Sequence, residues 1–590
     1  MIKWILRWWI VITIAILSGV ILFLVWLKQR SFNGIFPTVL QVSVSATSTV
    51  FVGVLARNMA EQQAEKREVD YNFQRIQQQK SELRQIQATA ITHISSNNLV
   101  TIAAAVTEMV GIILSWDQMV KNKHISVKEG EEHAQELLNL AFKSKIDISV
   151  DQVDQDQAIP VIKAKSEGLH ELIHKMTSTG IKTGHINLNG ARISNALLNN
   201  EDLSGLKLQG VHLEHAQLKN AILVKTDLTK ASLENIFLNE ANLKSAYLNG
   251  ANLMEAHLEG ANFKNASLRG SFLKKAYLNG AILQTTHLEG ANLQGAALKH
   301  THVENTFLRG ARLDAAEMEG VFLNGAIIEH VSLISANLTV AHLEKVTIRE
   351  SNLRKARLNG ANMTGSIIEH VYLTNAYLTG SRINLSNLRG ANLQSAHLEN
   401  AELKGTQLEK ANLSFAELTG ANLAQADLTG ANLTWANLTG ANLNGALLPG
   451  VRLIKATLRK AYLARTHLGR AQLHAANLES ANLKKAYLKG AILRGAHLEY
   501  ADLRGAHLEY ADLRGAHLKN ADLREAHLEY ADLRGAHLEN ADLRGAHLEN
   551  ADLRKTHLQI ADLRETHLEG ANLMERKSEK AYSTIRKKKD

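Results

Sequence analysis

The chain has 590 residues, more than a single globular domain holds, and a net charge of +9. It contains no cysteine, which excludes disulfides, thiolate nucleophiles and cysteine-based metal sites. Residues 1–180 sum to +1, residues 181–570 to +4 and residues 571–590 to +4, so the long middle segment is nearly neutral. This distribution disfavours a nucleic-acid binder, which would carry one dominant basic face.

Residues 1–57 are predicted to form a membrane anchor. Residues 8–27 carry no charge and are long enough to span a bilayer as a helix. A cleaved signal peptide is the alternative, but the run is long for one and no small-x-small site directly follows Leu27. Aromatic side chains near the ends of the run are predicted to lie at the membrane interface. These are Trp8, Trp9 and Trp26.

A second spanning helix is predicted over residues 38–56, which are uncharged and rich in valine. An apolar segment beside the membrane is the alternative, because Gln41 and several Ser and Thr residues interrupt the stretch. With two spans, the basic residues on either side place the rest of the chain in the cytoplasm. With one span, the charge bias predicts no side.

Residues 58–180 are predicted to be α-helical, and to couple the anchor to the following segment and cap its first coil. Residues 61–90 are rich in Gln, Glu, Lys and Arg, which favour helices. Residues 99–116 form an apolar stretch that contains Glu108, which favours a buried helix over a further membrane span.

Residues 181–575 repeat a five-residue unit. A bulky apolar residue recurs at every fifth position from Leu188 to Leu573, which makes 78 units in one phase. In an extended unit such as residues 501–505, the first and third side chains point to one side and the second and fourth to the other. A helix would turn the apolar position by about 140° per unit, so no apolar stripe would form. The spacing therefore predicts a solenoid whose Ala and Leu side chains point inward.

Units such as Ala-Asn-Leu-Thr-Gly at 436–440 and Ala-Asp-Leu-Arg-Gly at 541–545 resemble the pentapeptide-repeat family, and the resemblance covers 181–575. It implies a right-handed quadrilateral β-helix with four units per coil, or about 19 coils. The predicted fold class is thus an all-β solenoid, preceded by one or two transmembrane helices and a small α-helical segment. Glu201 and Leu206 are too large for the inner small position, so irregular first coils are expected.

Aromatic residues at the fifth position of a unit are the candidate partner-docking residues. Phe415 and Trp435 are twenty residues apart, as are Tyr510 and Tyr530, so each pair is predicted to stack in adjacent coils. Exposed aromatic pairs on a rigid surface suit protein docking. Packing that only stiffens a corner is the alternative.

Histidines recur every ten residues in the last units, which places His497, His517, His537 and His557 in one column and His507, His527, His547 and His567 in another. A solvated ladder of duplicated coils is favoured over metal binding, so no metal site is predicted. The flanking charges, as in the Asp502/Arg504 and His507/Glu509 pairs, are predicted to pair for solubility.

No catalytic residue and no cofactor are predicted. Four basic residues occupy successive corners and should circle the coil: Lys455, Lys460, Arg465 and Arg470. A surface that binds nucleic acid would instead need a stripe of basic residues along one face. Residues 576–590 form a basic tail that solubilises the chain or contacts anionic lipid.

The predicted function is a membrane-tethered, non-enzymatic scaffold that presents a rigid rod for protein–protein interaction with an unidentified partner. The resemblance also allows a DNA-mimicking inhibitor of type II topoisomerases, although those relatives are acidic and soluble, or an accessory factor in membrane transport or lipid export. Homo-oligomers formed end to end are a further possibility that the sequence leaves open.

Overall fold

The computed structural model describes residues 68–94, 101, 105, 112, 136 and 187–573. The chain forms two compact units, Met1–His287 and Leu288–Asp590. Outside the described residues lie both predicted membrane helices, 8–27 and 38–56, the three interface tryptophans and the basic tail. Among the described residues, none belongs to a helix that is long and apolar enough to cross a membrane.

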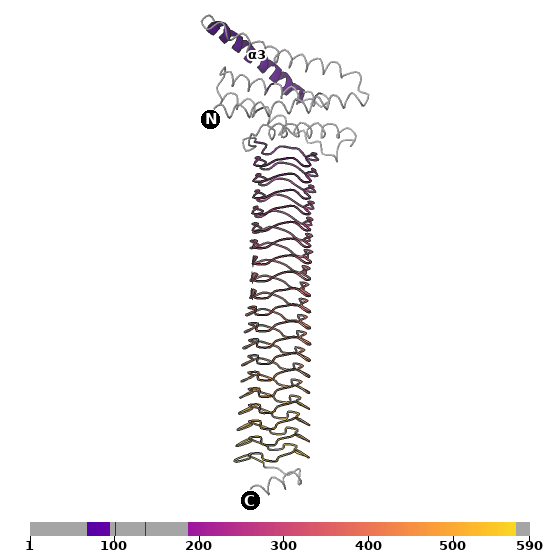
Figure 1. Ribbon diagram of the computed structural model, residues 1–590, viewed down its shortest axis with the longest axis vertical. Helices are drawn as coiled ribbons and strands as arrows, with labels where there is room; N and C mark the ends of the chain where they lie inside the picture. Colours follow the sequence, from indigo (N-terminus) through magenta and orange to yellow (C-terminus); the bar gives the residue numbers. More distant parts are fainter. Residues whose placement is uncertain are drawn as a thin grey trace, which may run out of the picture. The chain divides into compact units, whose positions relative to one another are not determined.

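Helix α3, Glu68–Ile94, belongs to the first unit and lies in the segment for which helices are predicted (Figure 1). Its buried residues Leu83, Gln87 and Ala90 recur at the spacing of one helix face. The amide of Gln87 donates a hydrogen bond to the carboxylate of Glu136, also helical, at 3.3 Å. The buried face of α3 thus contacts a segment 49 residues away in sequence.

The five-residue unit has the same conformation throughout residues 187–573. In the unit Ala501–Gly505, Ala501 and Leu503 are buried, while Asp502 and Arg504 face outward. The N–H of Ala506 donates to the carbonyl of Leu503 at 2.9 Å and closes a turn. Gly505 has a φ of 59°, the left-handed conformation that a turn of this kind requires at its third residue. Each unit therefore ends at a corner.

Adjacent coils are joined by backbone hydrogen bonds between residues twenty apart, so four units complete one coil (Figure 1). Asp502 forms a parallel bridge with Asp522. The N–H of Leu503 donates to the backbone carbonyl of Asp522 at 2.7 Å, and the N–H of Gly505 donates to the carbonyl of Arg524 at 2.9 Å. In return, the N–H of Asp522 donates to the carbonyl of Ala501 at 2.9 Å. Three backbone bonds per unit therefore hold the stack, and the predicted quadrilateral β-helix is confirmed in each compact unit.

The second unit contains a three-stranded parallel sheet in the order β1-β2-β3. The strands are β1, Ile327–Glu329, β2, Thr347–Arg349, and β3, Ile367–Glu369. They occupy one face in three successive coils, with Ile328, Ile348 and Ile368 in register and buried. The strands are three residues long because a corner follows each of them.

The core consists of columns of Leu and Ala, and other residues that stand in these columns are accommodated. Phe263 is fully buried in the Leu column, and smaller replacements are buried there as well. These are Val303, Met318, Ile328, Met363 and Ile383 in the Leu columns, and Thr286, Ser351 and Val371 in the Ala columns.

The expected irregularity of the first coils is wrong. Glu201 and Leu206 are buried, and their units show the same bridges and turns as the later ones. The residues one coil on in the same columns are the small Ala221 and Thr226, so a larger neighbour has room. The periodic backbone bonding thus overrides the poor side-chain fit.

Candidate functional site

The last coils carry the same side chains on opposite faces, because their ten-residue repeat is half of the twenty-residue coil. Units such as Ala501–Gly505 and Ala511–Gly515 present Asp and Arg on two opposite faces. Units such as Ala496–Tyr500 and Ala506–Tyr510 present His and Glu on the other two.

The Asp/Arg faces form ladders of bidentate ion pairs. Arg504 donates from Nε and Nη2 to the two carboxylate oxygens of Asp502 at 2.8 and 2.6 Å. Its Nε also lies 3.4 Å from Asp522 in the next coil. The bond from Arg504 lowers the pKa of Asp502, and the equivalent bond from Arg564 lowers the pKa of Asp562 to about 2. The predicted pairing within units is confirmed, and the structure adds links between coils.

The His/Glu faces contain stacked rings, which confirms the two predicted columns. From His497 to His557 the ring centroids are 4.7, 5.0 and 4.5 Å apart. The opposite column is longer and contains six rings with spacings between 4.5 and 4.9 Å. Its members are His467, Tyr487, His507, His527, His547 and His567.

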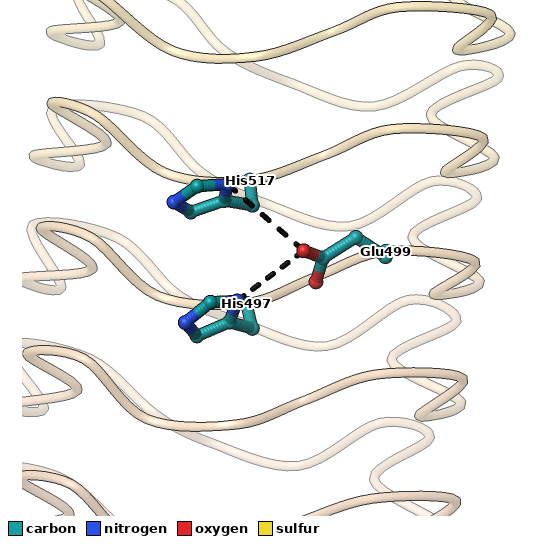
Figure 2. Close-up of side chains that lie close together, drawn as sticks. All are labelled: His497, Glu499 and His517. Atoms are coloured by element: carbon teal, nitrogen blue, oxygen red, sulfur yellow. Dashed lines mark hydrogen bonds and ion pairs between the residues drawn. The ribbon is translucent and has the colours of Figure 1, made fainter.

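Three groups in these columns combine two imidazoles with one carboxylate. Figure 2 shows Nδ1 of His497 and Nδ1 of His517 facing the same oxygen of Glu499, at 3.2 and 4.0 Å. The Nδ1 atom of His517 faces the glutamate of the previous coil, since the unit of His517 has Lys519 at the position where other units have glutamate. In each group the ligand atoms lie within 4.8 Å of one another. The other groups are His537, Glu539 and His557, and His547, Glu549 and His567.

The sequence predicts the pairing of His with Glu inside one unit, as for His507 and Glu509, but it predicts no group of three ligands. The signal for the third ligand is the twenty-residue spacing of the histidines, which places the ring of the next coil near the same carboxylate. The second and fourth residues of a unit point to the same outer side, as His507 Nδ1 and Glu509, 3.3 Å apart, show.

The predicted docking residues are all half-exposed at corners, but only one of the two predicted stacks forms. Tyr510 and Tyr530 stack with centroids 5.0 Å apart and ring planes within 2° of parallel. The predicted stack of Phe415 on Trp435 is wrong, since neither ring stacks on another among the described residues. Instead, Nζ of Lys455 lies 4.6 Å from the centroid of Trp435. Lys455 occupies the same corner as Trp435 in the next coil, and its ammonium group covers one face of the indole ring in a cation–π contact.

All four docking residues border one face, which we call the docking face. It consists of the units that lie twenty residues apart in one column. Phe415 and Trp435 end units of this column and lie at one edge, while Tyr510 and Tyr530 end the preceding units and lie at the other edge. The units are residues 411–415, 431–435, 451–455, 471–475, 491–495, 511–515 and 531–535.

The four predicted basic corners do circle the coil. Lys455, Lys460, Arg465 and Arg470 all have φ between 54° and 59°, the corner conformation, in four successive units. Their charges therefore point in four directions and form no stripe.

The repeats match a known family over most of their length. The profile described as "Pentapeptide repeats (8 copies)" matches residues 186–575 in overlapping segments, apart from 366–371. The chain belongs to the pentapeptide-repeat family. The right-handed quadrilateral β-helix that this family implies agrees with the four units per coil seen here.

Several solved structures of pentapeptide-repeat proteins are similar to parts of the chain. HetL from the cyanobacterium Nostoc sp. strain PCC 7120, described as involved in heterocyst differentiation regulation, is 32% identical over 35% of this chain and 88% of its own, with a TM-score of 0.22. QnrB1, a plasmid-mediated fluoroquinolone resistance protein, is 18% identical over 39% and 96%, with a TM-score of 0.18. Rfr23 from the cyanobacterium Cyanothece 51142 is 37% identical over 18% and 64%, with a TM-score of 0.10. No curated protein matches the chain.

Proposed function

We propose that the protein is a membrane-tethered, non-enzymatic scaffold whose docking face binds a partner protein. The observation that carries the proposal is the placement of four half-exposed aromatic side chains along the borders of one face. Aromatic residues dominate the binding energy of protein interfaces, because they bury a large area with little loss of conformational entropy.

The repeats support a binding role because the backbone offers a surface and no loop. From residue 187 to residue 573 the units keep one phase, and only a two-residue turn separates successive units. Catalytic groups in other folds are placed largely on loops that a scaffold positions. A regular surface without such loops suits recognition by shape and by repeated side chains.

The docking face is large enough for one partner. The units 431–435 and 511–515 are four coils apart, or about 19 Å along the stack at about 4.8 Å per coil. A standard interface, of about 800 Å² per partner, covers that distance. Arg452, on the face, and Lys455 and Arg470, at its borders, add positive charge between the two aromatic pairs. The partner that fits this surface has apolar and acidic side chains.

Co-purification from a detergent extract tests the docking face. We expect Trp435→Ala and Tyr510→Ala to lose the same partner that the full-length wild-type chain retains. Tyr462→Ala is the matched control, because Tyr462 is 51% exposed, as Trp435 is, but lies on a different face. Retention of the partner by both test variants, or its loss from the control, would contradict this assignment.

The membrane tether rests on the uncharged residues 8–27 and 38–56, and the two-span arrangement places the repeats in the cytoplasm. Residues 58–180 would then couple the anchor to the first coil. We expect the full-length chain to stay in the membrane pellet after extraction with alkaline carbonate, and the repeats to be cleaved by protease only after the membrane is opened. Release of the chain by carbonate would exclude the anchor, and cleavage in intact cells would reverse the topology.

DNA mimicry is the less well supported alternative, because it needs a surface of unpaired negative charge. In residues 502–564 the aspartates of the ladders are paired with arginines, as in the pairs of Asp502 with Arg504 and of Asp562 with Arg564. We therefore expect no inhibition in a supercoiling assay with a type II topoisomerase. Inhibition would favour the alternative over the scaffold.

A further inference from the structure

We propose that the three His/Glu groups of the last coils bind divalent transition-metal ions, one ion per group, with Zn²⁺ as the reference ion. This assignment goes beyond the scaffold function and reverses the expectation from the sequence that the histidines form only a solvated ladder. Imidazole nitrogen suits Zn²⁺, Co²⁺, Ni²⁺ and Cu²⁺. Two imidazoles and one carboxylate are a common set of three protein ligands for zinc, and water completes the coordination.

The backbone fixes the spacing of the ligands before any ion binds. His497 and His517 form a parallel bridge, and Leu498 N–H donates to the carbonyl of His517 at 2.6 Å. The same pattern joins His537 to His557 and His547 to His567. The ligands therefore come from rigid adjacent coils, and only side-chain rotations remain to be ordered on binding.

Those rotations are necessary, because the stacked rings are too far apart for a closed site. Two nitrogens that each lie about 2.0–2.1 Å from a tetrahedral zinc ion are about 3.3 Å from each other. The ring centroids of His497 and His517 are 4.7 Å apart. Their side chains are 47% and 41% exposed, so the rings can tilt towards each other without disturbing the Leu and Ala core. We expect an open site that is weaker than a closed structural zinc site.

Glu549 differs from Glu499 and Glu539 in one buried carboxylate oxygen without a partner. Glu304, Glu509 and Glu529, which belong to no three-ligand group, have such an oxygen as well, so this feature ranks the three groups and does not by itself indicate a cation. The Oε2 atom of Glu549 is buried and accepts no hydrogen bond, while Oε1 lies 3.2 Å from Nδ1 of His547. A buried carboxylate oxygen without a partner is costly, and a bound cation would satisfy it. The group of His547, Glu549 and His567 is therefore expected to bind most tightly of the three.

The chain also contains a natural counterexample. His302 lies 3.0 Å from Glu304, but the next ring in its column is Phe322, which stacks on it at 4.7 Å. On its other side Phe322 stacks on His342 at 4.6 Å. That column has one imidazole per carboxylate and forms no three-ligand group, and it shows that a phenyl ring fits between histidines. Substitution of His by Phe thus removes a ligand nitrogen and keeps the stack.

Equilibrium dialysis of the full-length chain tests the proposal. The chain is purified without a histidine tag, stripped with a chelator and dialysed against stepwise increasing Zn²⁺, and the bound metal is measured by mass spectrometry. We expect the variant with His517→Phe, His557→Phe and His567→Phe to bind three ions fewer per chain than the wild type. The single variant His567→Phe should bind one ion fewer than the wild type, and the lost ion should be the one that binds most tightly. The Co²⁺-loaded wild type should show visible d–d absorption that the triple variant lacks.

His342→Phe is the matched control, since it removes one half-buried histidine from a column that has no three-ligand group. It should leave the number of bound ions unchanged. Should the triple variant unfold, as judged by circular dichroism, the variant with Glu499→Gln, Glu539→Gln and Glu549→Gln keeps every ring and should weaken zinc binding by at least about 10-fold. Equal numbers of ions on the wild type and the triple Phe variant, or equal losses in His342→Phe and His567→Phe, would overturn the proposal.

Discussion

Arg504 contacts two aspartates at once, Asp502 in its own coil and Asp522 in the next. The same relation joins Arg524 to Asp522 and Asp542, and Arg544 to Asp542 and Asp562. The result is a continuous chain of charges that runs across coils, with a second one on the opposite face through Arg514 and Arg534. Isolated surface ion pairs contribute little to stability, whereas a network that links successive coils adds to their stacking.

Arg524→Gln interrupts this chain of charges between two coils. We expect the variant to unfold at a temperature about 1–2 °C lower than the wild type, because Asp522 loses its bidentate partner and Asp542 its link to the preceding coil. Arg452→Gln is the control, since Arg452 is exposed and lies outside the ladders. Thermal unfolding followed by circular dichroism measures both, and equal midpoints for the two variants would show that the network adds nothing.

Acid should weaken the same ladders. The arginine bonds lower the pKa values of Asp502, Asp542 and Asp552, and that of Asp562 to about 2. A carboxyl group whose pKa is lower in the folded chain than in the unfolded chain contributes its full stabilisation above its unfolded-state pKa of about 3.9. This contribution is lost as the pH falls towards its pKa in the folded chain. We expect the thermal midpoint to fall between pH 4 and pH 2, and to fall less when these four aspartates are replaced by asparagine. A fall of the same size in both chains would place the acid sensitivity elsewhere.

Two buried serines in the Ala columns differ in the hydrogen bonds of their hydroxyl groups. The hydroxyl of Ser386 donates to the carbonyl of Met363 at 2.7 Å and accepts from the N–H of Ser366 at 3.2 Å, whereas the buried hydroxyl of Ser381 has no partner. An unsatisfied buried hydroxyl is costly, while a satisfied one stabilises the fold modestly. Ser381→Ala should therefore raise the free energy of unfolding by about 1 kcal/mol and Ser386→Ala lower it by about 1 kcal/mol. Urea denaturation of the full-length chain measures both, and effects of the same sign would refute the distinction.

Glycine at one corner avoids a steric clash as well as backbone strain. Gly310 and Gly320 have φ of 69° and 62°, so alanine at either position costs about 1 kcal/mol. A Cβ atom at Gly320 would lie 2.5 Å from Nδ1 of His300, whereas none of the surrounding atoms lies within 4 Å of one at Gly310. Gly320→Ala should therefore be more destabilising than Gly310→Ala by about 0.5–1.5 kcal/mol, because His300 must leave its rotamer. Urea midpoints that coincide for the two variants would contradict this.

The inward positions of the repeat could be predicted from the sequence, because a five-residue period with Ala and Leu two residues apart allows few other folds. The buried Phe263, Met318 and Thr286 follow from the period alone. The four-unit coil came from the family resemblance, since the period itself does not fix how many corners close a coil. The regularity of the early coils does not follow from side-chain size, because backbone bonds hold Glu201 in place despite its poor fit.

The outer positions could be predicted only in part, because their contacts depend on which side chain follows twenty residues later. Tyr510 and Tyr530 are alike and stack, as expected. Trp435 lies between Phe415 and Lys455 in its column, and the contact with the lysine forms instead of the predicted stack. In two of the three His/Glu groups, Lys519 and Gln559 replace glutamate beside His517 and His557, whose Nδ1 atoms lie 4.0 and 3.8 Å from glutamates of the coil before.

The Leu column around Phe263 gives the most direct test of the core. Phe263 is the largest fully buried side chain among the described residues, and Leu243 and Leu283 lie one coil before and after it in the same column. Because every coil offers room for leucine there, Phe263→Leu should cost less than about 1.5 kcal/mol. Phe263→Ala leaves a cavity that the rigid coils cannot close, and should cost about 3–5 kcal/mol. Hydrogen exchange of the amides of Leu243 and Leu283 measures the local effect, and it should be faster in the alanine variant alone. Equal exchange in the two variants would mean that neighbouring coils collapse onto the cavity, and that the stack is less rigid than its backbone bonding indicates.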